Sequence, residues 1–194
     1  MNKKEIQRQR IMNYFIKAAK KIILEEGIKN VTVRKVADIA GYSYATIYNY
    51  FKDLDTLILY CINDFLEDCY EYVQTQKHPN NDIDKIKSLI NSYIEYFLKY
   101  PQSFQVIFIE DISVELPEEI VNNVLNPRVA ILLSEEFNNY AKKSKISNKN
   151  IDFIKELVSN YIHGKLLFYI KRGINQNHKE FIKDINDELN YILS

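Results

Sequence analysis

One short stretch, VADIAGYSYATIYNYF, constrains the fold more than any other part of the chain. It places Ala37, Gly41 and Ile47 at the spacing Ala-x3-Gly-x5-Ile. A helix-turn-helix joins two short helices that cross steeply through a turn of about three to four residues. It needs a small residue where the helices approach, a turn residue that accepts a left-handed backbone, and an apolar anchor on the second helix. These three residues supply those features, which predicts a helix-turn-helix over about residues 32–51.

The outer face of the second helix carries no charge. If Ile47 and Phe51 point inward, the face left outside consists of Ser43, Tyr44, Ala45, Tyr48 and Asn49. A solvated helix would normally show Glu or Lys there, whereas hydroxyl, amide and methyl groups suit base edges and phosphates in the major groove of DNA. The alternative is an ordinary helical hairpin with Gly41 as its cap. That alternative accounts for the glycine but not for the uncharged face.

The charge distribution agrees with a polyanionic partner at the N-terminal end. The net charge of the chain is zero, but residues 1–60 hold eleven Lys and Arg against six Asp and Glu. The remaining residues hold fifteen against twenty. Solvated basic faces are common, so this asymmetry supports the DNA prediction without establishing it.

The rest of the chain predicts an all-α protein. Gly and Pro are scarce at four each, and apolar residues recur at helical spacing throughout. The predicted helices cover about residues 5–26, 33–40, 44–50, 54–72, 82–99, 101–108, 118–125, 127–140, 151–172 and 178–193, with a kink or restart at Pro127. No apolar run approaches the roughly 20 residues of a membrane span, and the N-terminus leads into no signal-peptide core. We therefore expect a cytoplasmic protein that does not contact a membrane.

The sequence offers no sign of catalysis, metal binding or a cofactor. Phosphate-binding loops, nucleophile elbows and zinc-protease motifs are missing, and acidic residues are scattered without fixed geometry. Cys61 and Cys69 lie eight residues apart on one predicted helix, so they cannot pair. We expect no enzyme, no metal and no cofactor.

The run TVRKVADIAGYSYATIYNYFKDLDTL resembles the N-terminal domain of TetR-type transcriptional regulators, over about residues 8–65. The resemblance implies a three-helix DNA-binding domain at residues 1–53, joined to a larger helical effector-binding and dimerisation domain at 54–194. It also implies a homodimer that binds a near-palindromic operator in double-stranded DNA. Such a regulator is most often a repressor that a small molecule releases from its operator.

The resemblance also implies which residues contact DNA. Thr32 would bond a phosphate while capping its helix, and Tyr44 and Ala45 fall where such regulators often touch bases. Lys52 falls where a cation meets the DNA backbone. The complete predicted set is Thr32, Tyr42, Ser43, Tyr44, Ala45, Thr46, Tyr48, Asn49, Tyr50 and Lys52.

Two positions depart from the family pattern. Tyr42 stands where a small apolar residue is usual, and Leu54 stands where a phosphate-binding Lys is usual. Without that Lys, the salt dependence of DNA binding should be shallower by about one unit per lost contact.

The C-terminal part is rich in aromatic residues, which a pocket for a small apolar or aromatic effector would need. The predicted effector residues are Tyr93, Phe97, Phe104, Phe108 and His163. Ordinary core packing is the more common role for any one of them.

Gly164 lies in the middle of a predicted helix, where glycine costs about 1 kcal/mol relative to alanine. Close approach of another helix would explain it. In TetR-like proteins the two final main helices pair with their mates in a four-helix bundle. The predicted dimer interface is Leu157, Tyr161, Gly164, Phe168, Ile185 and Leu189.

Two other functions remain open at this point. One is a TetR-like DNA-binding protein without a small-molecule effector, which acts through a protein partner or as a nucleoid-associated factor. A filled C-terminal core would favour it. The other is a helical enzyme or protein-interaction module with a fortuitous helix-turn-helix, in which Tyr44→Ala would leave DNA binding unchanged.

Overall fold

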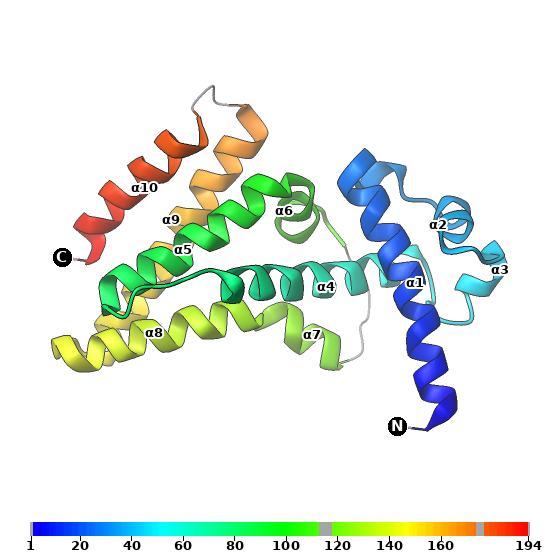
Figure 1. Ribbon diagram of the computed structural model, residues 1–194, viewed down its shortest axis with the longest axis horizontal. Coiled ribbons are helices and arrows are strands. Elements are labelled where there is room, and N and C mark those ends of the chain that lie inside the picture. The colour runs from blue at the N-terminus through cyan, green and yellow to red at the C-terminus, as the bar shows by residue number, and fades with distance from the viewer. Residues whose placement is uncertain (1, 113–117, 174–176, 194) are drawn as a thin grey trace. The chain divides into compact units, whose positions relative to one another are not determined.

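The computed structural model describes residues 2–112, 118–173 and 177–193. Within these residues every regular element is a helix and there is no strand (Figure 1). The all-α prediction is therefore confirmed. No helix in this described part of the chain combines the length and the apolar character that a membrane crossing requires.

The helices form two compact units. The first unit comprises Met1–Glu67 and Tyr100–Asn126, and the second comprises Asp68–Lys99 and Pro127–Ser194. Helix α4 (Leu54–Thr75) runs without interruption from the first unit into the second. The predicted functional boundary between residues 53 and 54 stays a prediction.

The first unit is built on α1 (Lys3–Glu26). This helix begins at a capping box, in which the Asn2 side chain accepts from the Glu5 N–H at 2.9 Å and the Glu5 carboxylate accepts from the Asn2 N–H at 2.7 Å. One face of α1 is apolar and buried, because its residues recur at helical spacing. That face consists of Met12, Phe15, Ile16, Ala18, Ala19, Ile22 and Ile23.

Short helices cover this face of α1. After a 3-10 turn η1 (Ile28–Asn30), α2 (Val33–Ala40) and α3 (Tyr44–Ile47) follow, and Figure 1 shows both beside α1. The remaining helices of the unit are the first part of α4, α6 (Pro101–Phe108) and α7 (Glu118–Leu125).

Four helices dominate the second unit, in which α5 (Asp82–Lys99) packs against the other three. The other three are α8 (Arg128–Ser144), α9 (Asn148–Arg172) and α10 (His178–Leu193). Pro127 has an extended backbone and separates α7 from α8, so the chain restarts a helix there rather than kinking one.

The core of the second unit contains two of the predicted dimer residues. Ile185 and Leu189 on α10 have no exposed surface within a single chain. They belong to the interior with Phe97 and Leu166 and have no surface to offer a partner. Their helical spacing reveals one apolar face of α10, and that face is occupied by α5 and α9 of the same chain.

Candidate nucleic-acid interface

The turn between α2 and α3 has the predicted geometry. Gly41 has φ 77° and ψ 29°, which lies in the left-handed region of the backbone that residues with a Cβ rarely adopt. Its N–H donates to the Asp38 carbonyl at 3.3 Å, and the Tyr42 N–H donates to the Ala37 carbonyl at 3.0 Å. This pair of bonds ends α2 and turns the chain directly into α3.

Two apolar anchors fix the orientation of α3. Ile47 and Phe51 are each 1% exposed, as is Ala37 on the facing helix. The Phe51 ring lies 6.3 Å from that of Phe15 and 5.4 Å from that of Tyr60, in edge-to-face arrangements. With these side chains inward, the opposite face of α3 is directed outward.

Helix α3 is shorter than the sequence suggests. It spans Tyr44–Ile47, and the chain continues in tighter turns in which the N–H groups of Asn49 and Tyr50 donate to carbonyls three residues earlier. Ser43 is its N-cap residue, but its side chain makes no bond to the helix backbone. The Ser43 hydroxyl lies 2.8 Å from that of Thr46 instead.

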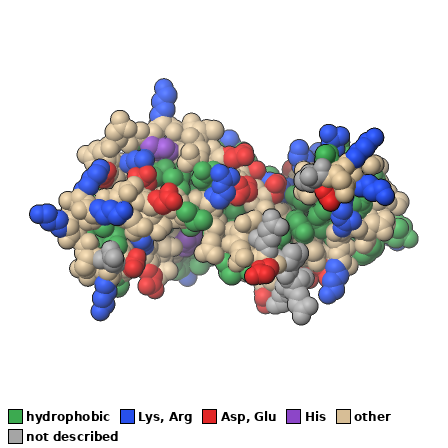
Figure 2. All heavy atoms as spheres, turned by 90° about the horizontal axis from the view of Figure 1, so that it is seen from below, with side chains coloured by type: hydrophobic (Ala, Val, Ile, Leu, Met, Phe, Trp, Pro, Cys, Tyr) green, Lys and Arg blue, Asp and Glu red, His purple; other side chains and the backbone are tan. Residues whose placement is uncertain are grey.

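Most predicted DNA contacts share the exposed face around α3. Tyr44 and Tyr48 are 58% and 54% exposed, values that leave both rings available to a partner. The exposed members of the predicted set are Thr32, Ser43, Tyr44, Ala45, Tyr48, Asn49 and Lys52, and Tyr42, Thr46 and Tyr50 are half-buried. In Figure 2, Lys and Arg are more prominent than Asp and Glu at the right-hand end of the view, where α1, α2 and α3 lie.

Capping groups position both ends of this face. The Thr32 hydroxyl oxygen accepts from the Lys35 N–H at 3.3 Å and is exposed, so its proton can be donated to a phosphate. Asp53 accepts from the N–H and the hydroxyl of Thr56 at 2.7 and 2.6 Å, which fixes the start of α4. These hydrogen bonds hold the pKa of Asp53 below its usual value, so its carboxylate stays ionised next to Lys52.

Two of the predicted tyrosines pack against α1. The Tyr42 ring lies 5.2 Å from the ring of Phe15 and 6.3 Å from that of Tyr14. The Tyr50 ring lies 5.9 Å from Phe15. The departure at position 42 thus has a packing role, since the larger ring covers apolar surface of α1 next to the turn.

Arg8 also contacts this segment, although it is not among the predicted DNA-binding residues. Its guanidinium donates to the Asn49 carbonyl at 3.0 Å and lies 5.0 Å from the centroid of the Tyr50 ring. Arg8 therefore joins the N-terminal part of α1 to the end of the α3 turn. No local pattern reveals this contact, because 41 residues separate the two partners.

The predicted effector residues fall into two groups. Tyr93, Phe97 and His163 meet in the second unit, where the Tyr93 and Phe97 rings are 4.9 Å apart and the Tyr93 hydroxyl lies 2.9 Å from His163 Nε2. Phe104 and Phe108 belong to the first unit, with ring centroids 5.0 Å apart. Phe104 is buried and Phe108 is 41% exposed.

The contacts of His163 define its tautomer. Nδ1 lies 2.8 Å from the Ser159 carbonyl, which can only accept, so Nδ1 carries the hydrogen. Nε2 then accepts the hydroxyl proton of Tyr93. Burial lowers the pKa of His163, so the neutral ring is the favoured form.

This arrangement makes stability depend on pH. In the folded chain His163 binds a proton less readily than in the unfolded chain, where its pKa is about 6.5. Its contribution to the free energy of unfolding is complete above pH 6.5 and decreases as the pH falls below that value. Urea denaturation of the full chain at several pH values measures this decrease.

His163→Phe should reduce that pH dependence, because the titrating group is gone. At pH 8 it should cost about 1–3 kcal/mol, since the buried Tyr93 hydroxyl loses its acceptor. If the free energy of unfolding of this variant still falls below pH 6.5 as steeply as that of the wild type, groups other than His163 cause the pH dependence.

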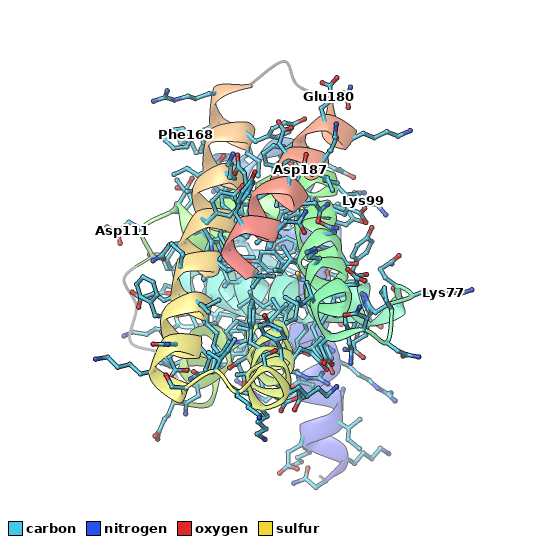
Figure 3. All side chains as sticks on the ribbon, turned by 90° about the vertical axis from the view of Figure 1, so that its left-hand side faces the viewer. Lys77, Lys99, Asp111, Phe168, Glu180 and Asp187 are labelled. Carbon is cyan, nitrogen blue, oxygen red and sulfur yellow. The ribbon has the colours of Figure 1, made fainter. Side chains whose placement is uncertain are left out.

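Two of the predicted dimer residues on α9 are exposed. Leu157 and Phe168 are 41% and 48% exposed, and Figure 3 shows Phe168 pointing outward from α9, away from α10. Among the described residues, no atom of another element lies within 4 Å of where a Cβ on Gly164 would be. Tyr161 is half-buried, and its hydroxyl donates to the Glu188 carboxylate on α10.

The described ranges contain no group of three or more His, Cys, Asp and Glu placed to hold a metal ion. Cys61 and Cys69 are free thiols in the interior. Burial raises the pKa of both thiols far above the usual value, so they remain protonated.

Comparisons with known proteins agree with this geometry. Residues 15–61 match the family model for bacterial regulatory proteins of the tetR family. This segment begins at Phe15 on α1 and ends at Cys61 on α4, so it contains the whole helix-turn-helix. The curated protein sequences contain no match to the chain.

Solved structures share the fold along nearly the whole chain. A putative TetR-family transcriptional regulator from Rhodococcus sp. is 15% identical, with a TM-score of 0.72 over 96% of this chain and 100% of that one. The fatty acid degradation regulator FadR from Bacillus halodurans is 16% identical, with a TM-score of 0.69 over 92% and 93%. RolR in complex with resorcinol is 14% identical, with a TM-score of 0.64 over 97% and 95%.

At such identities these structures establish the common fold, and the family match rests on the N-terminal segment. Residues 15–61 carry both that match and the turn geometry around Gly41. From these observations, residues 15–61 are similar to the tetR family of bacterial regulatory proteins, and the chain shares its fold with solved structures described as TetR-family transcriptional regulators.

Proposed function

We propose that this regulator is a cytoplasmic homodimeric repressor that a small molecule releases from a near-palindromic operator. The observation that carries the DNA part is the exposed, uncharged face around α3, anchored from behind by Ile47 and Phe51. Tyr44 and Ala45 enter the major groove, where a hydroxyl can bond a base edge and a methyl group can contact thymine. Thr32 and Lys52 bind phosphates on either side.

An exposed apolar stripe on α9 supports the dimer. Phe153 is 65% exposed, and Leu157 and Phe168 are nearly half exposed. With about 100° of rotation per residue, these three and Gly164 fall within a sector of roughly 60° on the helix. Pairing two such stripes about a two-fold axis would bury them, and would present two α3 helices about one DNA turn, or roughly 34 Å, apart.

Gly164→Leu should weaken dimerisation without harming the fold of the chain. Leucine removes the helix cost of glycine, about 1 kcal/mol, and the described residues leave open space around its Cβ. In the dimer the added side chain would separate the two α9 helices. Sedimentation velocity should show a shift towards monomer, while urea denaturation of the monomeric species shows no loss of stability.

Gly164→Ala is the matched control, because alanine also favours the helix over glycine but adds only a methyl group. It should remain dimeric. If Gly164→Leu is as dimeric as the wild type, Gly164 does not lie in the interface.

For the effector, we propose a small aromatic or apolar molecule. The supporting observations are the cluster of Tyr93, Phe97 and His163 and the similarity of the fold to RolR, which is solved with resorcinol. Phe104 and Phe108 stay in the proposed set. Effector binding would favour a conformer in which α4 has moved, because that helix belongs to both units, and operator affinity would fall as a result.

A regulator without a small-molecule effector is the second candidate. Phe97 is completely buried, and the polar atoms of Tyr93 and His163 already satisfy one another. Such a filled cluster leaves those groups no unmet hydrogen bond for a ligand. In this case a protein partner would control the DNA-bound state.

The decisive experiment uses the purified full chain and DNA from its own promoter region. Fluorescence anisotropy should show sequence-selective binding that weakens linearly with the logarithm of salt concentration. Small aromatic compounds such as resorcinol should then lower that affinity if the effector proposal holds. Absence of any selective binding at low salt would contradict the proposed function.

A further inference from the structure

The first unit contains a cavity that the proposed function does not use. It has a volume of about 400 Å³ and lies between α1, α4 and α7. None of the predicted effector residues lines it. The volume falls in the range of small-molecule sites, which is about 300–1,000 Å³.

The apolar part of the lining comes from two helices. Met12 and Ile16 on α1 are buried, and Ile120 on α7 is half-buried. The rings of Tyr50 and Tyr60 add aromatic surface, so a flat molecule would find apolar contacts for its faces.

The polar part of the lining is unusually rich in carboxamides. Asn13, Asn63 and Asn123 come from three different helices, and Gln9 donates to Asn13 at 3.3 Å. Among the described residues, the side chains of Asn63 and Asn123 make no hydrogen bond. Each carboxamide presents a donor and an acceptor next to each other, which is the pattern that matches the edge of a nucleobase.

The lining contains two charged residues, Arg8 and Asp64, and both interact with other residues of the first unit. Asp64 forms an ion pair with Lys20 at 2.5 Å, so the ammonium group of Lys20 offsets its negative charge. Arg8 uses one N–H on the Asn49 carbonyl, and a guanidinium has five donors. The cavity therefore suits a ligand whose rim offers both acceptors and donors.

Two lining residues also touch the proposed DNA-reading segment. Arg8 bonds to Asn49 and lies over Tyr50, and both Arg8 and Tyr50 line the cavity. We infer that this cavity is a regulatory site for a planar nucleobase-like heterocycle, whose occupancy is transmitted to the end of the α3 turn through Arg8 and Tyr50. The effect of the ligand on the α3 turn matters only if the proposed DNA binding is correct. Binding of the ligand in the cavity does not depend on that proposal.

The binding test uses adenine, hypoxanthine, cytosine and uracil, with their ribonucleosides, on the full chain. At least one should saturate at millimolar concentration or below and shift the side-chain amide signals of Asn63 and Asn123 in 1H–15N NMR spectra. Asn63→Leu should weaken that binding at least about tenfold, which corresponds to 1.4 kcal/mol. Asn139→Leu, on the exposed face of α8, is the matched control and should bind like the wild type.

The transmission test measures operator affinity with and without the probe that binds. In the wild type, the probe should change operator affinity at least about fivefold, which is the lower end of the range for allosteric coupling between two sites. Arg8→Lys keeps the positive charge but loses the planar guanidinium, so even with the probe at saturation this variant should show no change in operator affinity.

Failure of every probe to bind, or binding that Asn63→Leu does not weaken, would overturn the site. Binding that leaves operator affinity unchanged would overturn the transmission. A chain that binds a probe in the cavity but no DNA would contradict the proposed function and leave the site standing.

Discussion

Tyr44→Ala should lower operator affinity by about 1–3 kcal/mol per half-site, or roughly 5- to 150-fold, without changing the free energy of unfolding. Tyr44 is the most exposed of the tyrosines on the outer face of the helix-turn-helix, at 58%. A two-fold dimer carries the substitution in both half-sites, so the loss in free energy should double. Fluorescence anisotropy at one fixed salt concentration measures it.

The matched control is Tyr191→Ala, which removes an even more exposed tyrosine from α10. It should bind DNA like the wild type. Equal affinities for the Tyr44→Ala variant and the wild type would place base recognition elsewhere, and would favour a fortuitous helix-turn-helix over a DNA-reading one.

Phe51→Ala should destabilise the first unit by about 3–5 kcal/mol. The Phe51 ring is 1% exposed and packs edge-to-face against Phe15 and Tyr60, so its removal leaves a cavity between α1 and α4. Operator binding should fall as well, because Phe51 holds the α3 turn against α1. Urea denaturation followed by circular dichroism measures the loss of stability.

Tyr48→Ala is the comparison for stability, because Tyr48 lies three residues earlier and is 54% exposed. Its effect on the free energy of unfolding should stay within about 0.5 kcal/mol. A similar loss of stability in both variants would show that the α3 turn is not anchored through Phe51.

The ends of the helices could be predicted well because their signals are local. Gly41 and Gly173 both adopt left-handed conformations directly after helices, as expected for glycine at such positions. Pro127 starts a new helix because it cannot continue the previous one. The length of α3 was harder to predict, since Tyr48, Asn49 and Tyr50 can follow a helix or a tighter turn with the same outward face.

The exposed face around α3 was also predictable from local spacing. Ala37, Gly41 and Ile47 lie within eleven residues, so their relation hardly depends on the rest of the chain. Tyr42 shows the limit of that approach. Its position in the pattern predicts a DNA contact, but the pattern gives no sign that its ring also packs on Phe15, a residue 27 positions earlier in the chain.

The all-α class, the helix-turn-helix and most helix boundaries follow from the sequence alone, because capping, helical periodicity and turn conformation act over a few residues. Which apolar stripe is interior depends on how the helices pack: Ile185 and Leu189 are buried, while Leu157 and Phe168 are exposed. Periodicity shows that a helix has an apolar face but not what covers it. The contact of Arg8 with Asn49 and the cavity beside it depend in the same way on how distant helices pack.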